Sequence, residues 1–233
     1  MTEHQVVPGD EWVDARRRLL AKEKDFLRHR DELSRERREL PWEHVAKPYV
    51  FDGAAGKETL ADLFAGCSQL IVYHFMFAPD SDTGCRGCSF WADSYNGMIP
   101  HLAQRDVSFA AVSRAPLAKL QAFAARMGWS FKWVSSANND FNYDYQVSFR
   151  KEDVARGTAM YNYTSYQESM PDKPGFSVFF KDGADIFHTY STYARGLDPV
   201  NSAFQLLDLV PKGRDEAGLA HPMSWVKLHD QYA

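Results

Sequence analysis

The residues best suited to chemistry in this sequence are Cys85 and Cys88, which are separated by Arg86 and Gly87. Thiol–disulfide exchange needs one exposed thiolate and a second thiol that resolves the mixed disulfide. Cys85 follows a loop and precedes an expected helix, so backbone N–H groups and the helix dipole would stabilise its thiolate, and Arg86 adds a nearby positive charge. Cys88 lies one helical turn further on and on the same face. We therefore predict that Cys85 is the nucleophile and Cys88 the resolving thiol.

The same spacing of two cysteines also occurs in zinc sites, which need four ligands. Apart from this pair, the chain offers only Cys67 and scattered histidines at no ligand spacing. We therefore expect no metal and no cofactor. Three cysteines are an odd number at low density, which argues against a secreted disulfide scaffold. A scaffold that retains the cysteines without using them stays open as an alternative.

The elements that must position this pair follow from hydrophobic periodicity and turn residues. We expect strands at 49–51, 69–77, 107–113, 131–135, 176–180 and 186–192, and helices at 10–40, 59–64, 89–104, 116–127, 141–147 and 198–209. Residues 69–77 are apolar almost throughout, as in a strand buried on both faces. This order predicts an α/β fold with a mixed sheet, in which a C-x-x-C beside a βαβ unit indicates a thioredoxin-like redox motif.

Several segments carry a resemblance to known families. Residues 51–66 resemble the opening hairpin of peroxiredoxins and of membrane-anchored periplasmic thiol reductases, and residues 174–183 (PGFSVFFKDG) are similar to thioredoxin. A bacterial family of thioredoxin-like proteins, the domain-of-unknown-function 899 family, resembles nearly the whole chain. The segments that carry this likeness are 71–77 (IVYHFMF), 84–93 (GCRGCSFWAD), 112–117 (VSRAPL), 141–144 (FNYD) and 187–198 (FHTYSTYARGLD).

The resemblance implies a thioredoxin-like fold, a mixed central sheet flanked by helices, and further site residues. Alignment with thioredoxin puts His74 where that protein has a buried aspartate below the C-x-x-C. A histidine there would help to deprotonate Cys88, although a core histidine bonded to the backbone is the alternative. Pro174 takes the place of a cis proline that faces the active cysteine. We expect Pro174, Trp91 and Arg86 to contact substrate.

Residue pattern and composition divide the chain into three parts. Residues 1–47 form a helical extension, 48–210 the thioredoxin-like domain with an insertion at about 148–173, and 211–233 an irregular tail. The long helix has an apolar stripe at seven-residue spacing that includes Trp12, Phe26 and Leu33. We favour packing of this stripe on the same chain, because the companion heptad positions are polar. A homodimer through this helix is the alternative.

Composition excludes several classes of partner. The net charge is −4 and the pI is about 6.1, so no excess of basic charge is available for a nucleic acid. The longest apolar run, 70–79, is far shorter than the roughly 20 residues that span a bilayer. No basic segment followed by an apolar stretch opens the chain, so we expect no signal peptide, no membrane partner and a cytoplasmic location.

Three functions compete on this basis. The first is a thiol–disulfide oxidoreductase whose partner is a disulfide-containing protein or a small-molecule thiol. The second is a peroxidase of the peroxiredoxin type. Residues 79–85 come within one residue of the peroxiredoxin P-x-x-x-T-x-x-C loop, but no arginine precedes the late strand. The third is a binding module without catalysis, in which binding would survive replacement of both cysteines by serine.

Overall fold

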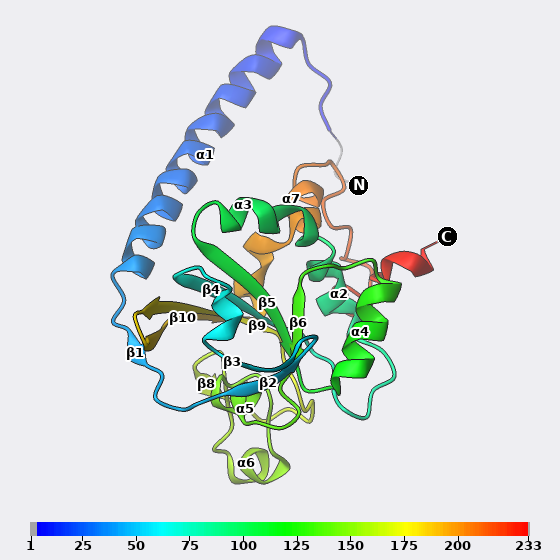
Figure 1. Cartoon of the computed structure of the whole chain (residues 1–233). Helices are drawn as coiled ribbons and strands as arrows, with labels where there is room; N and C mark the ends of the chain where they lie inside the picture. The colour runs from blue at the N-terminus through cyan, green and yellow to red at the C-terminus, as the bar shows by residue number, and fades with distance from the viewer. Residues whose placement is uncertain (1–3, 233) are drawn as a thin grey trace. The chain divides into compact units, whose positions relative to one another are not determined.

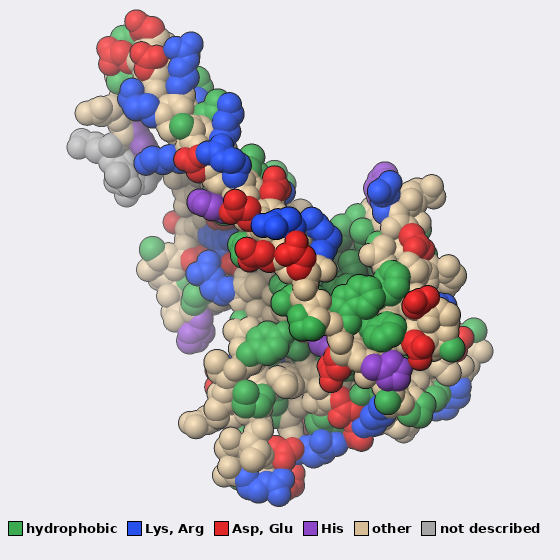
Figure 2. All heavy atoms as spheres, turned by 90° about the vertical axis from the view of Figure 1, so that its left-hand side faces the viewer, with side chains coloured by type: hydrophobic (Ala, Val, Ile, Leu, Met, Phe, Trp, Pro, Cys, Tyr) green, Lys and Arg blue, Asp and Glu red, His purple; other side chains and the backbone are tan. Residues whose placement is uncertain are grey.

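A computed structural model describes residues 4–232, and contacts divide the chain after Pro41 into two compact units. The first unit is built on α1 (Gly9–Arg38), which has Asp10 and Glu11 in its first turn and three arginines in its last. This charge order complements the helix macrodipole. Figure 2 shows acidic and basic side chains interspersed along the helix. Packing of its apolar stripe on the same chain, or in a homodimer, stays a prediction.

The second unit contains an eight-stranded mixed sheet in the order β1-β10-β9-β4-β5-β6-β2-β3 (Figure 1). β4, β5 and β6 are parallel, whereas the remaining neighbours pair antiparallel. The strands are β1 (Glu43–His44), β2 (Val50–Gly53), β3 (Gly56–Thr59), β4 (Gln69–His74), β5 (Val107–Ser113), β6 (Lys132–Ser135), β9 (Gly175–Asp182) and β10 (Asp185–Tyr193). A strand, a helix that begins at the C-x-x-C, a parallel strand and an antiparallel hairpin follow one another. The predicted thioredoxin-like α/β fold is therefore confirmed.

The helices of this unit are short. They are α2 (Arg86–Ala92), α3 (Ile99–Ala103), α4 (Leu117–Arg126), α5 (Phe141–Asp144), α6 (Lys151–Arg156) and α7 (Ser202–Leu207), with 3-10 turns η1 (Asp62–Phe64), η2 (Asn96–Met98), η3 (Ala194–Val200) and η4 (His229–Gln231). Within residues 4–232, no helix is both long enough and apolar enough to cross a bilayer.

The single helix expected over 89–104 is wrong, because the chain breaks between α2 and α3. The Asn96 side chain donates to the Gly128 carbonyl (2.9 Å) and accepts from the Ser130 N–H (3.0 Å). These bonds to another segment compete with helix continuation. Pro100 lies in the first turn of α3, where its missing N–H costs nothing, so a new helix begins there.

The insertion has more structure than its polar sequence indicates. It contains α6 and a separate two-stranded ribbon, β7 (Met160–Tyr161) and β8 (Thr164–Ser165). Phe149, Ala159 and Tyr166 form its own small core, and the Phe149 and Tyr166 rings stack at 4.0 Å. Residues far apart in sequence close these contacts, so local periodicity does not reveal them.

The sheet carries a hydrophobic core on each face, and β4 contributes to both. Tyr73 lies in the core that contains Cys88, whereas Leu70 and Val72 lie in the core on the other face. Alternation of side chains along a strand accounts for this division. The face on which a β4 residue lies therefore decides whether it meets the dithiol.

Candidate dithiol site

The two cysteines lie where β4 passes through a loop into α2. Cys85 is the N-cap residue of α2, with extended backbone angles (φ −60°, ψ 129°), and its carbonyl accepts the first helical bond from the Ser89 N–H (2.9 Å). Cys85 is half-buried and Cys88 is buried, and both thiols are free. The partly accessible thiol of Cys85 therefore lies one helical turn before the buried thiol of Cys88.

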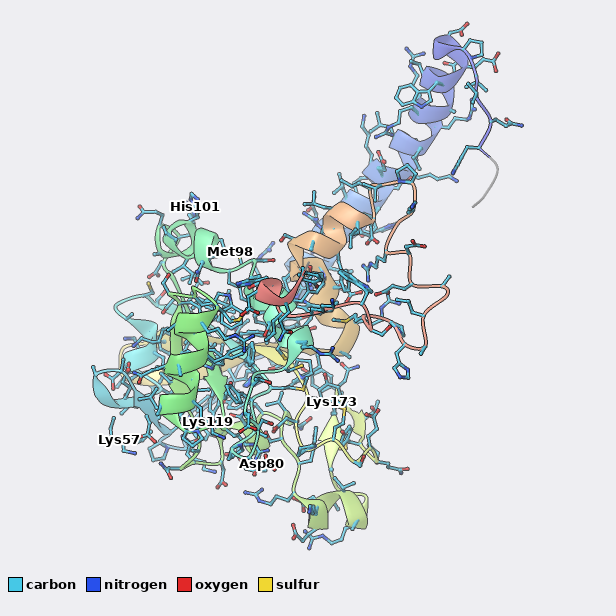
Figure 3. All side chains as sticks on the ribbon, turned by 90° about the vertical axis from the view of Figure 1, so that its right-hand side faces the viewer. Lys57, Asp80, Met98, His101, Lys119 and Lys173 are labelled. Atoms are coloured by element: carbon cyan, nitrogen blue, oxygen red, sulfur yellow. The ribbon has the colours of Figure 1, made fainter. Side chains whose placement is uncertain are left out.

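The loop before Cys85 is closed against the end of β4. The Cys85 N–H donates to the Met76 carbonyl (3.1 Å). Gly84 is required here, because a Cβ at this position would lie 2.8 Å from ring atoms of both Phe75 and Phe123. Lys119 of α4 donates to the carbonyls of Pro79 (3.0 Å) and Ser81 (2.7 Å), and Figure 3 shows Lys119 on the same side as Asp80. The loop is thus held at both its middle and its end.

The Cys88 sulfur accepts a hydrogen bond from the backbone of the same loop. The Met76 N–H donates to Cys88 Sγ at 3.4 Å. The Tyr73 hydroxyl donates its single proton to the Cys88 carbonyl at 3.1 Å, and its interaction with the Cys88 side chain lowers the pKa of that thiol. The Met76 N–H is therefore the donor to the Cys88 sulfur, and the Tyr73 hydroxyl lies beside it.

The environment separates the two thiols by acidity. Cys85 has its pKa lowered from 9.0 to about 7 by a hydrogen bond from the Cys88 thiol, against opposition from burial. The N–H groups of Cys88 and Gly87 and the charge of Arg86 add to this lowering of the Cys85 pKa. Burial, followed by interaction with Cys85, raises the pKa of the Cys88 thiol. This is the order that a nucleophile and a resolving thiol require.

The predicted position of His74 below the C-x-x-C is wrong. His74 is buried, and its ring lies against Phe141 and Tyr145 on the face of the sheet opposite Cys88. Side chains alternate along β4, and the C-x-x-C lies on the face of Tyr73. Tyr73 therefore occupies the position below the dithiol that the alignment assigns to His74.

His74 instead ends a buried chain of polar side chains. Its Nε2 lies 2.8 Å from Ser177 Oγ, which lies 2.8 Å from Ser191 Oγ. Ser191 Oγ lies 2.7 Å from His188 Nε2, and His188 Nδ1 lies 3.3 Å from the Glu43 carboxylate. Burial lowers the pKa of His74 from 6.5 to about 3, so this imidazole is neutral at physiological pH. His74 is therefore a hydrogen-bonded core histidine, and its partner is the Ser177 side chain and not the backbone.

Pro174, Trp91 and Arg86 are the residues expected to contact substrate, and they differ in whether they line the cavity beside Cys88. Pro174 and Trp91 line a cavity of about 320 Å³ together with Cys88. Trp91 is fixed by a bond from its Nε1 to the Leu197 carbonyl (2.8 Å). Arg86 is exposed and does not line this cavity. Residues 4–232 contain no cis peptide bond, so Pro174 is trans at the place where thioredoxin has a cis proline.

Several residues of this site were not predicted from the sequence, and three of them bear on its chemistry. Tyr73, Arg195 and Met223 also line the cavity. The alternation of β4 could have identified Tyr73 once the face of the C-x-x-C was known. Arg195 and Met223 come from η3 and from the irregular tail, where no periodic pattern indicates a site.

The described part of the chain, residues 4–232, brings together no group of three or more His, Cys, Asp or Glu side chains that could hold a metal ion. Cys67 lies elsewhere, with its N–H bonded to the Phe64 carbonyl (2.9 Å). The chemistry available at the site is therefore that of the two thiols and the hydroxyl and amide donors around them.

Solved structures with a similar course of the chain include peroxiredoxins. Peroxidoxin BcpB from Mycobacterium tuberculosis is 14% identical and covers 72% of this chain and 97% of its own, with a TM-score of 0.48. A Xanthomonas campestris peroxiredoxin Q variant is 18% identical and covers 72% of this chain and 98% of its own, with a TM-score of 0.48. A hypothetical protein from Sinorhizobium meliloti is 14% identical over 73% of this chain and 82% of its own, with a TM-score of 0.43. Identities this low transfer no activity to the present chain.

No curated protein matches the sequence. The model of one protein family, described as a bacterial protein of unknown function, matches residues 1–232. This match spans the long helix, the C-x-x-C and the C-terminal tail together. The chain therefore belongs to the bacterial protein family of unknown function DUF899.

Proposed function

We propose that this protein is a thiol–disulfide oxidoreductase in which Cys85 attacks and Cys88 resolves. The observation that carries the proposal is the asymmetry of the two thiols. Cys85 is half-buried with a pKa lowered to about 7, whereas Cys88 is buried behind it with a raised pKa. A dithiol that exchanges in two ordered steps needs this difference in access and acidity.

The first step is attack by the Cys85 thiolate on one sulfur of a substrate disulfide. The Cys85–substrate disulfide forms, the substrate S–S bond breaks, and one substrate thiolate leaves. Cys88 then loses its proton to solvent or to the leaving thiolate and attacks Cys85 Sγ. The Cys85–Cys88 disulfide forms and the second substrate thiolate leaves. The dithiol loses two electrons and the substrate gains them.

Tyr73 and the Met76 N–H support the second step. A buried thiolate at Cys88 is unfavourable unless donors replace water around the sulfur. The Met76 N–H is such a donor at 3.4 Å. The Tyr73 hydroxyl, which donates to the Cys88 carbonyl, can turn its proton to the sulfur when the thiolate forms. Burial raises the pKa of Tyr73 well above 10.0, so this hydroxyl acts as a hydrogen-bond donor and not as a base.

Redox titration of the purified full chain against a glutathione buffer tests the proposal, with thiols trapped and counted by mass spectrometry. We expect two of the three thiols to oxidise together and reversibly to an intramolecular disulfide. Cys67→Ser should leave this behaviour unchanged. Cys88→Ser should accumulate a mixed disulfide with glutathione, and Cys85→Ser should accumulate none.

Two results would contradict this function. One is a pair that stays reduced over the whole range of glutathione ratios, and the other is equal oxidation of all three cysteines.

Reaction with hydrogen peroxide tests the peroxidase alternative, because the loop before Cys85 is one residue shorter than the peroxiredoxin motif. We expect the rate constant for oxidation of Cys85 by hydrogen peroxide to be no larger than that of a free small-molecule thiolate. A rate typical of a dedicated peroxidase would favour that alternative instead.

A further inference from the structure

The cavity beside Cys88 is closed on one side by the C-terminal tail. Its volume of about 320 Å³ lies at the lower end of the range for small-molecule sites. Trp91 comes from α2, Leu197 from η3 and Met223 from the tail. Three segments distant in sequence thus build one pocket around the resolving cysteine.

The tail is held firmly enough to act as a wall. One carboxylate oxygen of Glu216 accepts from the Met223 N–H (2.7 Å) and from Trp225 Nε1 (2.8 Å). Further along, Asp230 pairs with Arg126 of α4 at 2.7 Å, and Figure 1 shows the C-terminal end beside that helix. Leu228 is buried in the same core as Cys88. The turn that carries Met223 is therefore fixed at both ends.

Met223 lies beside Gly87, in the turn between the two cysteines. A Cβ at Gly87 would lie 3.4 Å from Met223 Cε and 3.7 Å from Cys85 Sγ. A larger side chain at position 87 would compete with Met223 for this space. The methionine thus forms the tail side of the pocket that Cys88 and Gly87 also line, next to the turn that carries the nucleophile.

Several backbone groups next to the pocket are already hydrogen-bonded to the insertion. The Lys173 N–H donates to the Val147 carbonyl (2.9 Å), and Ser148 forms an antiparallel bridge with Asp172. The Pro174 carbonyl accepts from the Tyr161 hydroxyl (2.8 Å). Extended peptides gain affinity by main-chain pairing with an exposed edge. The insertion therefore takes up backbone groups that an extended protein segment would need for pairing at residues 172–174.

The rim of the pocket carries one cation that a ligand can reach. The Arg195 side chain is 91% exposed, and its guanidinium lies 3.5 Å from the Asp198 carboxylate. Asp198 is held more closely by Arg214, at 3.1 Å. The loose pairing leaves the Arg195 donors accessible to a carboxylate, which a guanidinium binds in a directional way.

From these observations we infer that the site reduces low-molecular-weight disulfides with an apolar body and an acidic group, in preference to disulfides of proteins. The apolar body lies between Trp91, Leu197 and Met223, and the acid meets Arg195. Met223 is the specificity-determining residue, and Glu216 positions it. This inference rests on the proposed exchange at Cys85 and Cys88.

Single-turnover kinetics of the pre-reduced full chain in a Cys67→Ser background test the inference. The probes are dithiobis(nitrobenzoate), an aromatic disulfide with carboxylates, neutral dithiodipyridine, and insulin. Each rate is divided by the rate of the same probe with free dithiothreitol. We expect the wild type to favour the acidic aromatic disulfide over dithiodipyridine, and both over insulin, with two thiols released per chain.

The variants separate charge from shape. Arg195→Gln should slow the acidic probe about tenfold and dithiodipyridine by less than about twofold, because only the acidic probe loses an ion pair. Arg105→Gln is the matched control and should change neither rate, because Arg105 is exposed in the turn between α3 and β5 and does not line the cavity. Met223→Ala should raise the insulin rate relative to the small probes about tenfold by opening the wall.

Glu216→Ala should reproduce Met223→Ala, and Glu216→Gln, which keeps an acceptor oxygen, should restore wild-type selectivity. Leu219→Ala controls for general loosening of the tail. Faster normalised reduction of insulin than of small disulfides by the wild type would overturn the inference, as would equal slowing of both aromatic probes in Arg195→Gln. If the wild type reduces no disulfide, or if Cys85→Ser is equally active, the proposed function itself fails, and the inference fails with it.

Discussion

The Tyr73 hydroxyl donates a 3.1 Å hydrogen bond to the carbonyl of Cys88, and the interaction of this hydroxyl with the Cys88 side chain lowers the pKa of the thiol. A residue at the end of the central strand is thereby tied to the resolving cysteine of α2. His74, the next residue, lies on the other face and reaches Ser177 instead. Of these two adjacent residues of β4, Tyr73 therefore contacts the dithiol and His74 contacts the core on the other face of the sheet.

Tyr73→Phe should slow resolution of the mixed disulfide while leaving the first attack by Cys85 nearly unchanged. The variant removes one donor to the Cys88 thiolate, a loss of about 1.4 kcal/mol or roughly tenfold in rate. Acid quenching followed by mass spectrometry would show a longer-lived mixed disulfide. Tyr95→Phe is the matched control, because the Tyr95 hydroxyl is buried in the same core without a hydrogen-bond partner. Equal effects of the two variants would exclude a specific role for Tyr73.

Alkylation of Cys85 should report its acidity directly. With a pKa of about 7, roughly half of the molecules carry the Cys85 thiolate at pH 7, compared with about one in a hundred for a thiol of pKa 9. The rate with iodoacetamide should therefore rise with pH around a midpoint near 7, and Cys88 should be labelled last. Arg86→Gln should move the midpoint upwards, because it removes a charge that favours the thiolate. A midpoint near 9 in the wild type would contradict this reading.

His74→Phe should flatten the pH dependence of stability below pH 6.5. The folded pKa is lowered to about 3, so in this range the unfolded chain binds a proton that the folded chain does not. The free energy of unfolding contributed by this group is retained above pH 6.5 and falls by about 1.4 kcal/mol per pH unit below it. Denaturant unfolding at pH 7 and pH 5 should show a wild-type loss about 2 kcal/mol larger than that of the variant.

The exposed His101 provides the control, since His101→Gln should retain the wild-type slope. The same His74→Phe protein should resolve mixed disulfides at the wild-type rate, because His74 and Cys88 lie on opposite faces of the sheet. Slower resolution in this variant would show that the polar chain behind β4 communicates with the dithiol.

Asp172→Asn should destabilise the protein strongly through the insertion. The Asp172 carboxylate accepts two bonds from Arg114, at 2.8 and 2.9 Å, and one from Ser148 at 2.6 Å. Asp172 is only 8% exposed, so loss of its charge leaves the Arg114 guanidinium without a counterion in a largely buried place. We expect a loss of about 3 kcal/mol in the free energy of unfolding. Arg156→Gln, which breaks an exposed pair with Asp153, should cost less than about 1 kcal/mol.

The sequence by itself determined the succession of the main strands and helices along the chain and the C-x-x-C at the start of a helix. These features depend on neighbours within a few residues, so periodicity and turn residues report them. It also identified Cys85 and Cys88 and placed Pro174 and Trp91 near them. The break after Ala92 was not predicted, because its cause is a bond from Asn96 to the distant Gly128 carbonyl.

Only the tertiary structure decided which face of β4 meets the dithiol. Alternation assigns Tyr73 and His74 to opposite faces, but packing of α2 determines which of the two lies below Cys88. The position of Met223 beside the cavity likewise depends on its hydrogen bond to Glu216 and on the ion pair between Asp230 and Arg126 of α4. No local sequence pattern encodes these contacts. Local patterns specify elements, whereas the pocket is formed by side chains that meet only after those elements have packed.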